Sequence, residues 1–164
     1  MHRLNTTRLA IAGPILLAVA ACGSESADAP APFNPEPLEI AERQDNFKAI
    51  GKSFKTIRGQ LEGDAPDLAV IEASASDINT RLQRVGDLFP AGSGMDAGFD
   101  TEALAKVWED PDGFAQVNQD AINASAELMA AAASGDVAAV GPQVGNLGMK
   151  GCKGCHDVYR VDDG

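Results

Sequence analysis

Apolar residues along most of this chain recur at intervals of three and four, the spacing typical of amphipathic α-helices. The first such segment runs from Leu38 to about Leu61 and is closed by a turn at 62–64. The second begins near Pro66, a favourable residue for a first helical turn, and continues towards Phe89. Its inward positions are Leu68, Ile71, Ala75, Ile78, Leu82, Val85 and Phe89. The pattern predicts two helices joined by a short turn.

A Gly-rich loop separates these helices from the rest of the chain. Pro90 is followed by the sequence AGSGMDAGF, which has no helical period, and residues 101–108 are expected to add one or two helical turns. A third helix is predicted from about Asp112, with Phe114, Val117, Ala121, Leu128 and Ala131 inward, and it ends at 134–135.

The fourth predicted helix runs from an N-cap at Asp136 to about Arg160. Pro142 lies too deep for the first turn of this helix, so we expect a kink or a late start there. No stretch alternates with a period of two, which argues against strands. Four amphipathic helices of about 20 residues predict an all-α fold, an antiparallel four-helix bundle that occupies residues 38–164.

The beginning of the chain has the pattern of an export signal. Arg3 and Arg8 precede an apolar stretch, Leu9 to Ala21, that is too short for a lasting transmembrane helix. Val-Ala-Ala-Cys at its end resembles a lipobox, in which the cysteine is acylated and becomes the mature N-terminus. We therefore expect a lipoprotein signal peptide at 1–21 and a lipid on Cys22. The alternative is an ordinary secretory signal with a cysteine near the cleavage site.

Residues 22–37 are rich in Pro, Ala and Ser and predict a lipid-anchored linker. Extended at about 3.1 Å per residue, residues 23–37 of this linker could hold the domain up to roughly 45 Å from a membrane. The mature chain would carry 11 basic and 24 acidic residues, a formal charge of −13. Such a charge argues against nucleic-acid binding and against adhesion to anionic lipid. It also predicts that an unidentified redox partner is neutral or basic where it touches.

The last part of the chain holds the motif C-x-x-C-H, at Cys152, Cys155 and His156. This is the attachment signal of a c-type haem: the two thiols each bond one vinyl group, and the histidine is placed under the iron. A structural zinc site needs four ligands, and a thioredoxin-type pair needs a βαβ setting, so neither fits this chain. The motif predicts one covalent haem c with His156 as its axial ligand.

The sixth coordination position has few candidates. After processing, His156 is the only histidine, and the remaining methionines are Met95, Met129 and Met149. Met149 lies on the attachment helix and cannot cross to the other haem face, Met95 lies in the Gly-rich loop, and Met129 fits core packing. The first helix contains no methionine, which favours an iron with one protein ligand.

Arg43 and Gln44 interrupt the apolar stripe of the first helix between Ile40 and Phe47. A buried charge is costly unless it is paired, so an inward Arg43 would need an anionic partner, and haem propionates are available anions. The alternative is that the stripe begins only at Phe47 and that Arg43 is solvated.

These features together resemble the cytochromes c′, the class II c-type cytochromes. The resemblance rests on the C-terminal C-K-G-C-H-x-x-Y-R, the four-helix pattern, and Arg43-Gln44 followed by Phe47, and it covers about residues 37–160. It implies that Arg43 and Gln44 contact a propionate, that Phe47 faces the vacant iron position, and that Arg160 lies beside His156. The chain departs from the low-spin branch, which has a methionine on the first helix, and from the free periplasmic location of most relatives.

The resemblance and the apolar Phe47 together favour binding of small diatomic gases, above all nitric oxide. The expected location is the periplasm, with the protein anchored to a membrane through Cys22. The rival interpretations are a membrane-tethered electron-transfer shuttle and a haem-bearing accessory subunit. Catalytic turnover is not expected, because no acid or base can be placed near the iron. Relatives often form homodimers through the first two helices, but the outward residues of those helices here are too mixed in polarity to decide.

Overall fold

The structure is a computed structural model, and it describes residues 36–162. Within this range it contains α1 (Leu38–Glu62), α2 (Leu68–Gln83), α3 (Lys106–Glu109), α4 (Pro111–Ala133), α5 (Val137–Asn146) and α6 (Gly154–Tyr159). Two short 3₁₀ turns, η1 (Val85–Leu88) and η2 (Met95–Ala97), and a π-helical stretch, η3 (Leu147–Lys153), complete the set. The described residues form no strand, only an isolated bridge between Ala103 and Arg160. No described helix is long and apolar enough to cross a membrane.

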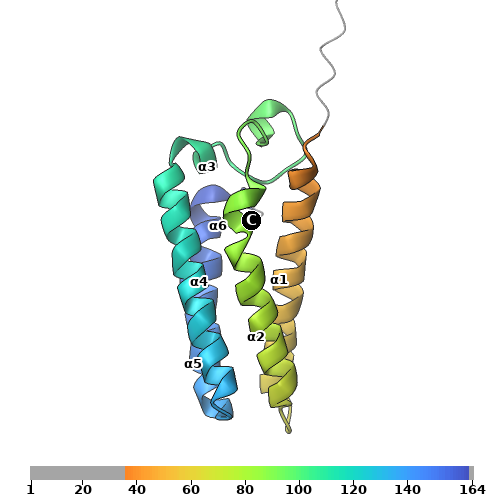
Figure 1. Cartoon of the computed structure of the whole chain (residues 1–164), viewed down its shortest axis with the longest axis vertical. Helices are drawn as coiled ribbons and strands as arrows, with labels where there is room; N and C mark the ends of the chain where they lie inside the picture. The colour runs from red at the N-terminus through yellow and green to blue at the C-terminus, as the bar shows by residue number, and fades with distance from the viewer. Residues whose placement is uncertain (1–35, 163–164) are drawn as a thin grey trace, which may run out of the picture. The chain divides into compact units, whose positions relative to one another are not determined.

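Four long helical segments form the bundle (Figure 1). α1 packs on α2, α2 on α4, and α4 on the continuous run of α5, η3 and α6, which returns beside α1. The short α3 and the loop before it lie at one end of the bundle (Figure 1). The predicted four-helix architecture is confirmed. The run of α5, η3 and α6 contains the C-x-x-C-H motif, so this motif lies between α1 and α4.

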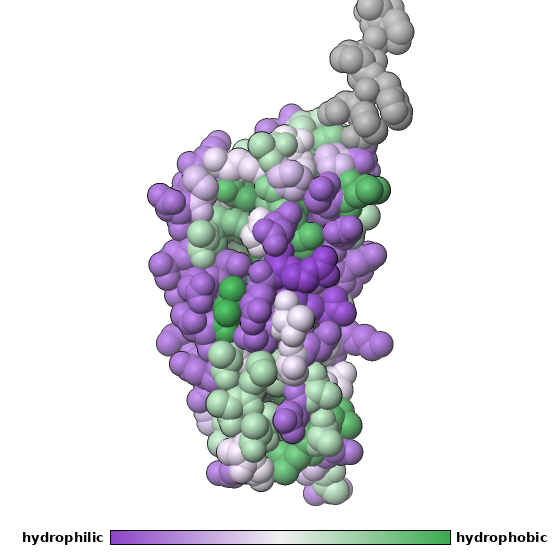
Figure 2. All heavy atoms as spheres, viewed as in Figure 1, coloured by the Kyte–Doolittle hydropathy of each residue, from purple (hydrophilic) through white to green (hydrophobic). Residues whose placement is uncertain are grey.

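The core is filled by the inward stripes that the sequence pattern predicts. The side chains that are at most 1% exposed include Ile40, Ile57, Ile71, Ile78, Leu128, Val140 and Leu147. On the face seen in Figure 2, hydrophilic residues predominate across the middle, and apolar residues are mixed with them towards both ends. Burying large aliphatic side chains at about 1.5–3 kcal/mol each is the main stabilisation of such a bundle.

The fourth helical segment begins where the sequence predicts and is irregular elsewhere. The Asp136 carboxylate accepts from the Ala138 N–H at 2.9 Å and caps α5, so the expected late start at Pro142 is wrong. Pro142 lies inside α5 on its exposed side, where water can reach the carbonyl that lacks a donor. The irregular part is instead η3, the π-helical stretch immediately before and including Cys152.

The second helix is shorter than predicted. α2 ends at Gln83, and Val85 and Leu88 are buried from the tighter turn η1 instead. The loop that follows is held against the bundle by Trp108, whose indole N–H lies 3.1 Å from the carbonyls of both Phe89 and Pro90. Gly94 packs so closely on the Trp108 ring that a Cβ there would come within 2.6 Å of it.

Candidate haem-binding site

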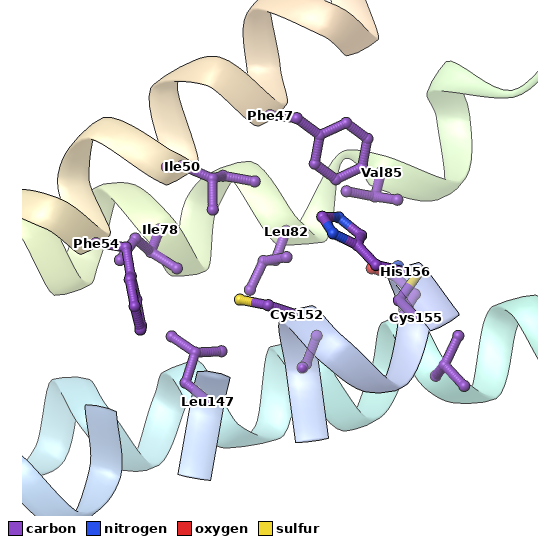
Figure 3. A pocket seen from close by; sticks show the side chains of 15 residues that line it. Phe47, Ile50, Phe54, Ile78, Leu82, Val85, Leu147, Cys152, Cys155 and His156 are labelled. Atoms are coloured by element: carbon purple, nitrogen blue, oxygen red, sulfur yellow. The ribbon is translucent and has the colours of Figure 1, made fainter. Parts of the chain in front are cut away.

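Two adjoining cavities lie between α1 and the C-terminal motif. The inner one, of about 150 Å³, is almost wholly apolar and is drawn in Figure 3. Its lining includes Ile50, Phe54, Ile78, Leu82, Val85 and Leu147. The outer one, of about 860 Å³, is more open and polar, and includes Arg43, Gln44, Lys48, Lys55, Glu102 and Arg160. Phe47, Gly51, Cys155 and His156 line both cavities, so the two are parts of one site.

The two thiols of the C-x-x-C-H motif line the inner cavity. Cys152 and Cys155 are both half-buried and are not joined in a disulfide. Burial raises the pKa of Cys152, and burial together with the neighbouring Cys152 raises the pKa of Cys155 to about 11. Both groups are therefore protonated at neutral pH, unlike the thiolates that bind metals or attack disulfides.

An aromatic ring on α1 faces the histidine of α6 across the site. The ring centroids of Phe47 and His156 are 6.5 Å apart, with an interplanar angle of 75°. Figure 3 shows both rings pointing towards each other from opposite elements. Phe89 contacts Phe47 edge to face, with the two ring centroids 6.4 Å apart. The position opposite His156 is thus occupied by a side chain that cannot coordinate a metal.

No methionine lines either cavity within the described part of the chain. Met95 and Met149 are 46% and 63% exposed, and Met129 packs against the hydrophobic core. His156 is also the only histidine among the lining residues.

Arg43 points inward, so the alternative of a solvated side chain is wrong. It is 2% exposed, and its guanidinium donates to the Ser93 hydroxyl at 2.8 Å, the Ser93 carbonyl at 2.6 Å and the Thr101 hydroxyl at 2.7 Å. The guanidinium also lies 4.9 Å from the Phe89 ring centroid. Burial lowers the pKa of Arg43, and Glu36 opposes this by Coulombic attraction. Arg43 therefore ties the long loop to the edge of the site.

Gln44 and Arg160 lie at the outer cavity. The exposed Gln44 amide donates to the Asp100 carbonyl at 3.1 Å. The Arg160 Nε donates to the Glu102 carboxylate at 2.6 Å, and the Ala103–Arg160 bridge fixes the adjoining backbone. Arg160 directly follows α6, the helix that carries His156, and lines the same outer cavity.

A tyrosine anchors the histidine-bearing helix to α4. Tyr159, 5% exposed, donates from its hydroxyl to the Asp110 carboxylate at 3.2 Å. The same carboxylate accepts from the Gly113 N–H and so caps α4. The Gly113 N–H bond is the main cause that lowers the pKa of Asp110, with contributions from Tyr159 and Lys106. Gly113 leaves room for this contact, because a Cβ there would come within 2.6 Å of the tyrosine hydroxyl.

Comparison with known proteins agrees with this geometry. The sequence profile of the Cytochrome C′ family matches residues 39–160. The chain belongs to the cytochrome c′ family. It is 36% identical over 125 residues to cytochrome c′ of Rhodopseudomonas palustris, which covers 74% of this chain and 81% of that protein. It is 34% identical over 121 residues to cytochrome c′ of Rubrivivax gelatinosus, covering 74% of this chain and 92% of that protein. The solved cytochrome c prime of Shewanella frigidimarina superposes with a TM-score of 0.70 at 34% identity, covering 79% of this chain and 99% of that one.

Members of this family carry one covalently bound haem c, and the residues of this chain fit such a group. An apolar inner cavity suits a porphyrin face, and two free thiols that line it, three residues apart, suit thioether links. An imidazole faces inward opposite a phenyl ring, and the polar end of the site carries Arg43, whose charge could meet a propionate. The predicted cofactor is therefore one haem c.

Several residues of the site are absent from the sequence prediction. Ser93 and Thr101 hold Arg43 but lie in a loop without a period, and no sequence signal points to them. Asp110 and Tyr159 carried weak signals: an aspartate before Pro111 is a common helix cap, and the tyrosine stands in the motif C-H-x-x-Y-R. Their contact joins residues 49 positions apart, which helical patterns cannot detect.

Proposed function

We propose that this protein binds small diatomic gases, above all nitric oxide, at a five-coordinate haem c. Cys152 and Cys155 would hold the haem through thioether links, and His156 would ligate its iron. When bound, the haem supplies an iron with one position open to an exogenous ligand. The observation that carries the proposal is Phe47, which faces His156 at 6.5 Å, while no methionine lines the cavities in residues 36–162.

Phe47 and its neighbours favour neutral, weakly polar ligands. The accompanying side chains Ile50, Leu82 and Val85 are apolar, so they offer no hydrogen bond to stabilise a polar complex of dioxygen. The phenyl ring also restricts space beside the iron, which disfavours bulky ligands. Support comes from a relative: cytochrome c prime from Alcaligenes xylosoxidans has been solved, in mutant form, as a nitric oxide complex, with a TM-score of 0.67 and 27% identity.

The polar residues around the site have separate roles in this proposal. Arg43 and Gln44 hold a propionate, and Arg43 keeps its bonds to the loop at the same time. Arg160 lies on the proximal side, held by Glu102. Tyr159 and Asp110 position the helix that carries His156. None of these residues takes part in turnover, and we expect no enzymatic activity.

The location proposed is the periplasm, with the protein anchored to a membrane through a lipid on Cys22. The signal peptide, Cys22 and most of the linker lie outside the described residues. A homodimer through α1 and α2 is compatible with this arrangement; one relative in the family has been solved as a dimer whose dissociation is controlled by ligand. Electron shuttling remains the second candidate, supported by a cationic edge at the haem cavity that is considered below.

Ligand kinetics test the proposal. Ferrous holoprotein mixed anaerobically with nitric oxide should form a tight complex, whereas exposure to dioxygen should give oxidation without a stable adduct. Phe47→Ala should speed the entry of carbon monoxide and cyanide. Phe54→Ala is the matched control, because it removes the same side chain from the same helix and cavity away from His156 (Figure 3). A stable dioxygen complex, or equal acceleration by both variants, would contradict the proposed role of Phe47.

A further inference from the structure

Three lysines on one face of α1 border the mouth of the haem site. Lys48, Lys52 and Lys55 are separated by four and three residues and are all exposed. Residues at these spacings are neighbours on a helix surface, and the three span about 10 Å along the axis at about 1.5 Å per residue. We call these three residues the lysine rim.

The lysine rim and the C-terminal motif belong to the same hollow. Lys48 and Lys55 line the outer cavity together with Cys155 and His156. All three lysines also line a shallow depression on α1 with Gly51, which itself lines the inner cavity. A partner seated on this rim would therefore lie beside the edge of the haem.

The positive charge of the rim is largely unneutralised. Lys48 meets Asp45 at 3.5 Å with both side chains more than 70% exposed, and among residues 36–162 no ion pair involves Lys52 or Lys55. Across the outer cavity, Glu102 is bound by Arg160 and Asp100 carries the remaining carboxylate. The proposed propionate site at Arg43 lies farther along α1, five residues before Lys48, which is about 7.5 Å along the axis at about 1.5 Å per residue.

This local charge is opposite to the net charge of the chain. Three of the 11 basic residues outside the signal peptide gather at the mouth of the outer cavity, beside Cys155 and His156. We propose that the lysine rim is the docking surface of a small acidic redox protein that exchanges one electron with the haem. A neutral or basic partner was expected because the charge of −13 was treated as uniform. At this site the lysines make the local charge positive, which favours an acidic partner instead.

The exchange is a simple outer-sphere transfer. The acidic partner is oxidised by one electron and the haem iron is reduced from ferric to ferrous, with no bond made or broken in this chain. The lysines attract and orient the partner, which raises the association rate without touching the iron. The proposal depends on the haem of the family and is independent of which gas binds.

Reduced flavodoxin, a small acidic one-electron donor, is a suitable probe. Its hydroquinone is mixed with ferric holoprotein in a stopped-flow instrument at low and at high ionic strength, and haem reduction is followed by absorbance. Although both proteins carry net negative charge, the second-order rate should fall as salt is added. Lys52→Gln with Lys55→Gln should lower the low-salt rate by about tenfold, the scale of local electrostatic steering.

The matched control changes net charge equally at another surface. Gln116→Glu with Gln119→Glu adds the same two negative units on the exposed side of α4, outside both cavities, and should leave the rate within about twofold. Lys52→Arg with Lys55→Arg should retain the native rate, and the haem absorption spectrum reports whether each variant is intact. A native rate that rises with salt, or equal losses in the Gln and Glu double variants, overturns the proposal. Hexaammineruthenium(II), a small cationic reductant, should reduce the haem at a rate that rises with salt. A flavodoxin rate that does not change with salt also overturns the proposal.

Discussion

Replacing Arg43 with alanine should destabilise the domain strongly, although a charged residue in an apolar stripe looks dispensable from the sequence. The substitution removes three hydrogen bonds from a charged donor, two of them to Ser93, which is fully buried. It also removes the guanidinium stacked 4.9 Å from the Phe89 ring and leaves a space in the core. The loop that begins at Pro90 would lose its main attachment to α1.

The magnitude follows from these contacts. A hydrogen bond to a charged group contributes about 1.5–3 kcal/mol, so the two bonds to Ser93 alone account for about 3 kcal/mol at the lower bound. For a domain of this size, about 3 kcal/mol lowers the midpoint of thermal unfolding by roughly 10 °C. Gln44→Ala is the neighbouring control: its amide makes one exposed bond, and surface changes stay within about 0.5 kcal/mol.

Two measurements separate the loop contact from the proposed propionate contact. Thermal unfolding of the holoprotein, followed by circular dichroism, measures the loop contact. The reduction potential measures the propionate contact, because removing a cation near the haem favours the ferric state and lowers the potential. Ser93→Ala with Thr101→Val should lower the melting temperature while leaving the potential nearly unchanged. If Arg43→Ala melts within about 2 °C of the unmutated protein, the reasoning from burial and hydrogen bonds fails.

Three further predictions follow from the remaining parts of the site and the anchor. Cys22→Ser should release the haem-loaded protein from the membrane fraction, and a soluble unmutated protein would refute the lipid anchor. Phe47→Met should convert the haem to a six-coordinate, low-spin form, checked by absorption spectroscopy, whereas an unchanged spectrum would mean that residue 47 does not face the iron. Asp110→Asn should melt lower than the unmutated protein at pH 7, and the difference should close as the pH falls below the ordinary aspartate pKa of about 3.9. The direction follows because the folded-state pKa of Asp110 is lowered, so its stabilisation is present above that range and lost in acid; a constant difference would contradict it.

The helices could be predicted because their signals are local. Spacings of three and four define the inward stripes, and the Asp136 carboxylate that caps α5 stands one residue before the helix. The end of α2 could not be predicted, because Val85 and Leu88 are buried in the 3₁₀ turn η1 just as they would be in a longer α2. The π-helical stretch has no such local signal, and neither does the close contact within it, where a Cβ at Gly151 would come within 3.2 Å of the Ala121 Cβ on α4.

The site divides in the same way. C-x-x-C-H is a contiguous motif with a fixed chemical meaning, so the sequence alone points to Cys152, Cys155 and His156. The inward orientation of Arg43 was one of two open alternatives, and burial decides it. Its partners lie 50 and 58 residues away in an aperiodic loop, so only the folded chain reveals them. The lysine rim has a helical spacing, but its importance depends on the cavity that lies beside it.

The spin state of the iron tests the central claim most directly. Resonance Raman spectra of the unmutated ferric and ferrous holoprotein report coordination number without any added ligand. The account predicts a high-spin ferrous haem with five ligands, since Phe47 faces His156 and no methionine lines the cavities in the described part of the chain. A six-coordinate, low-spin spectrum of the ferrous protein would show that another side chain ligates the iron and would contradict the proposed gas-binding site.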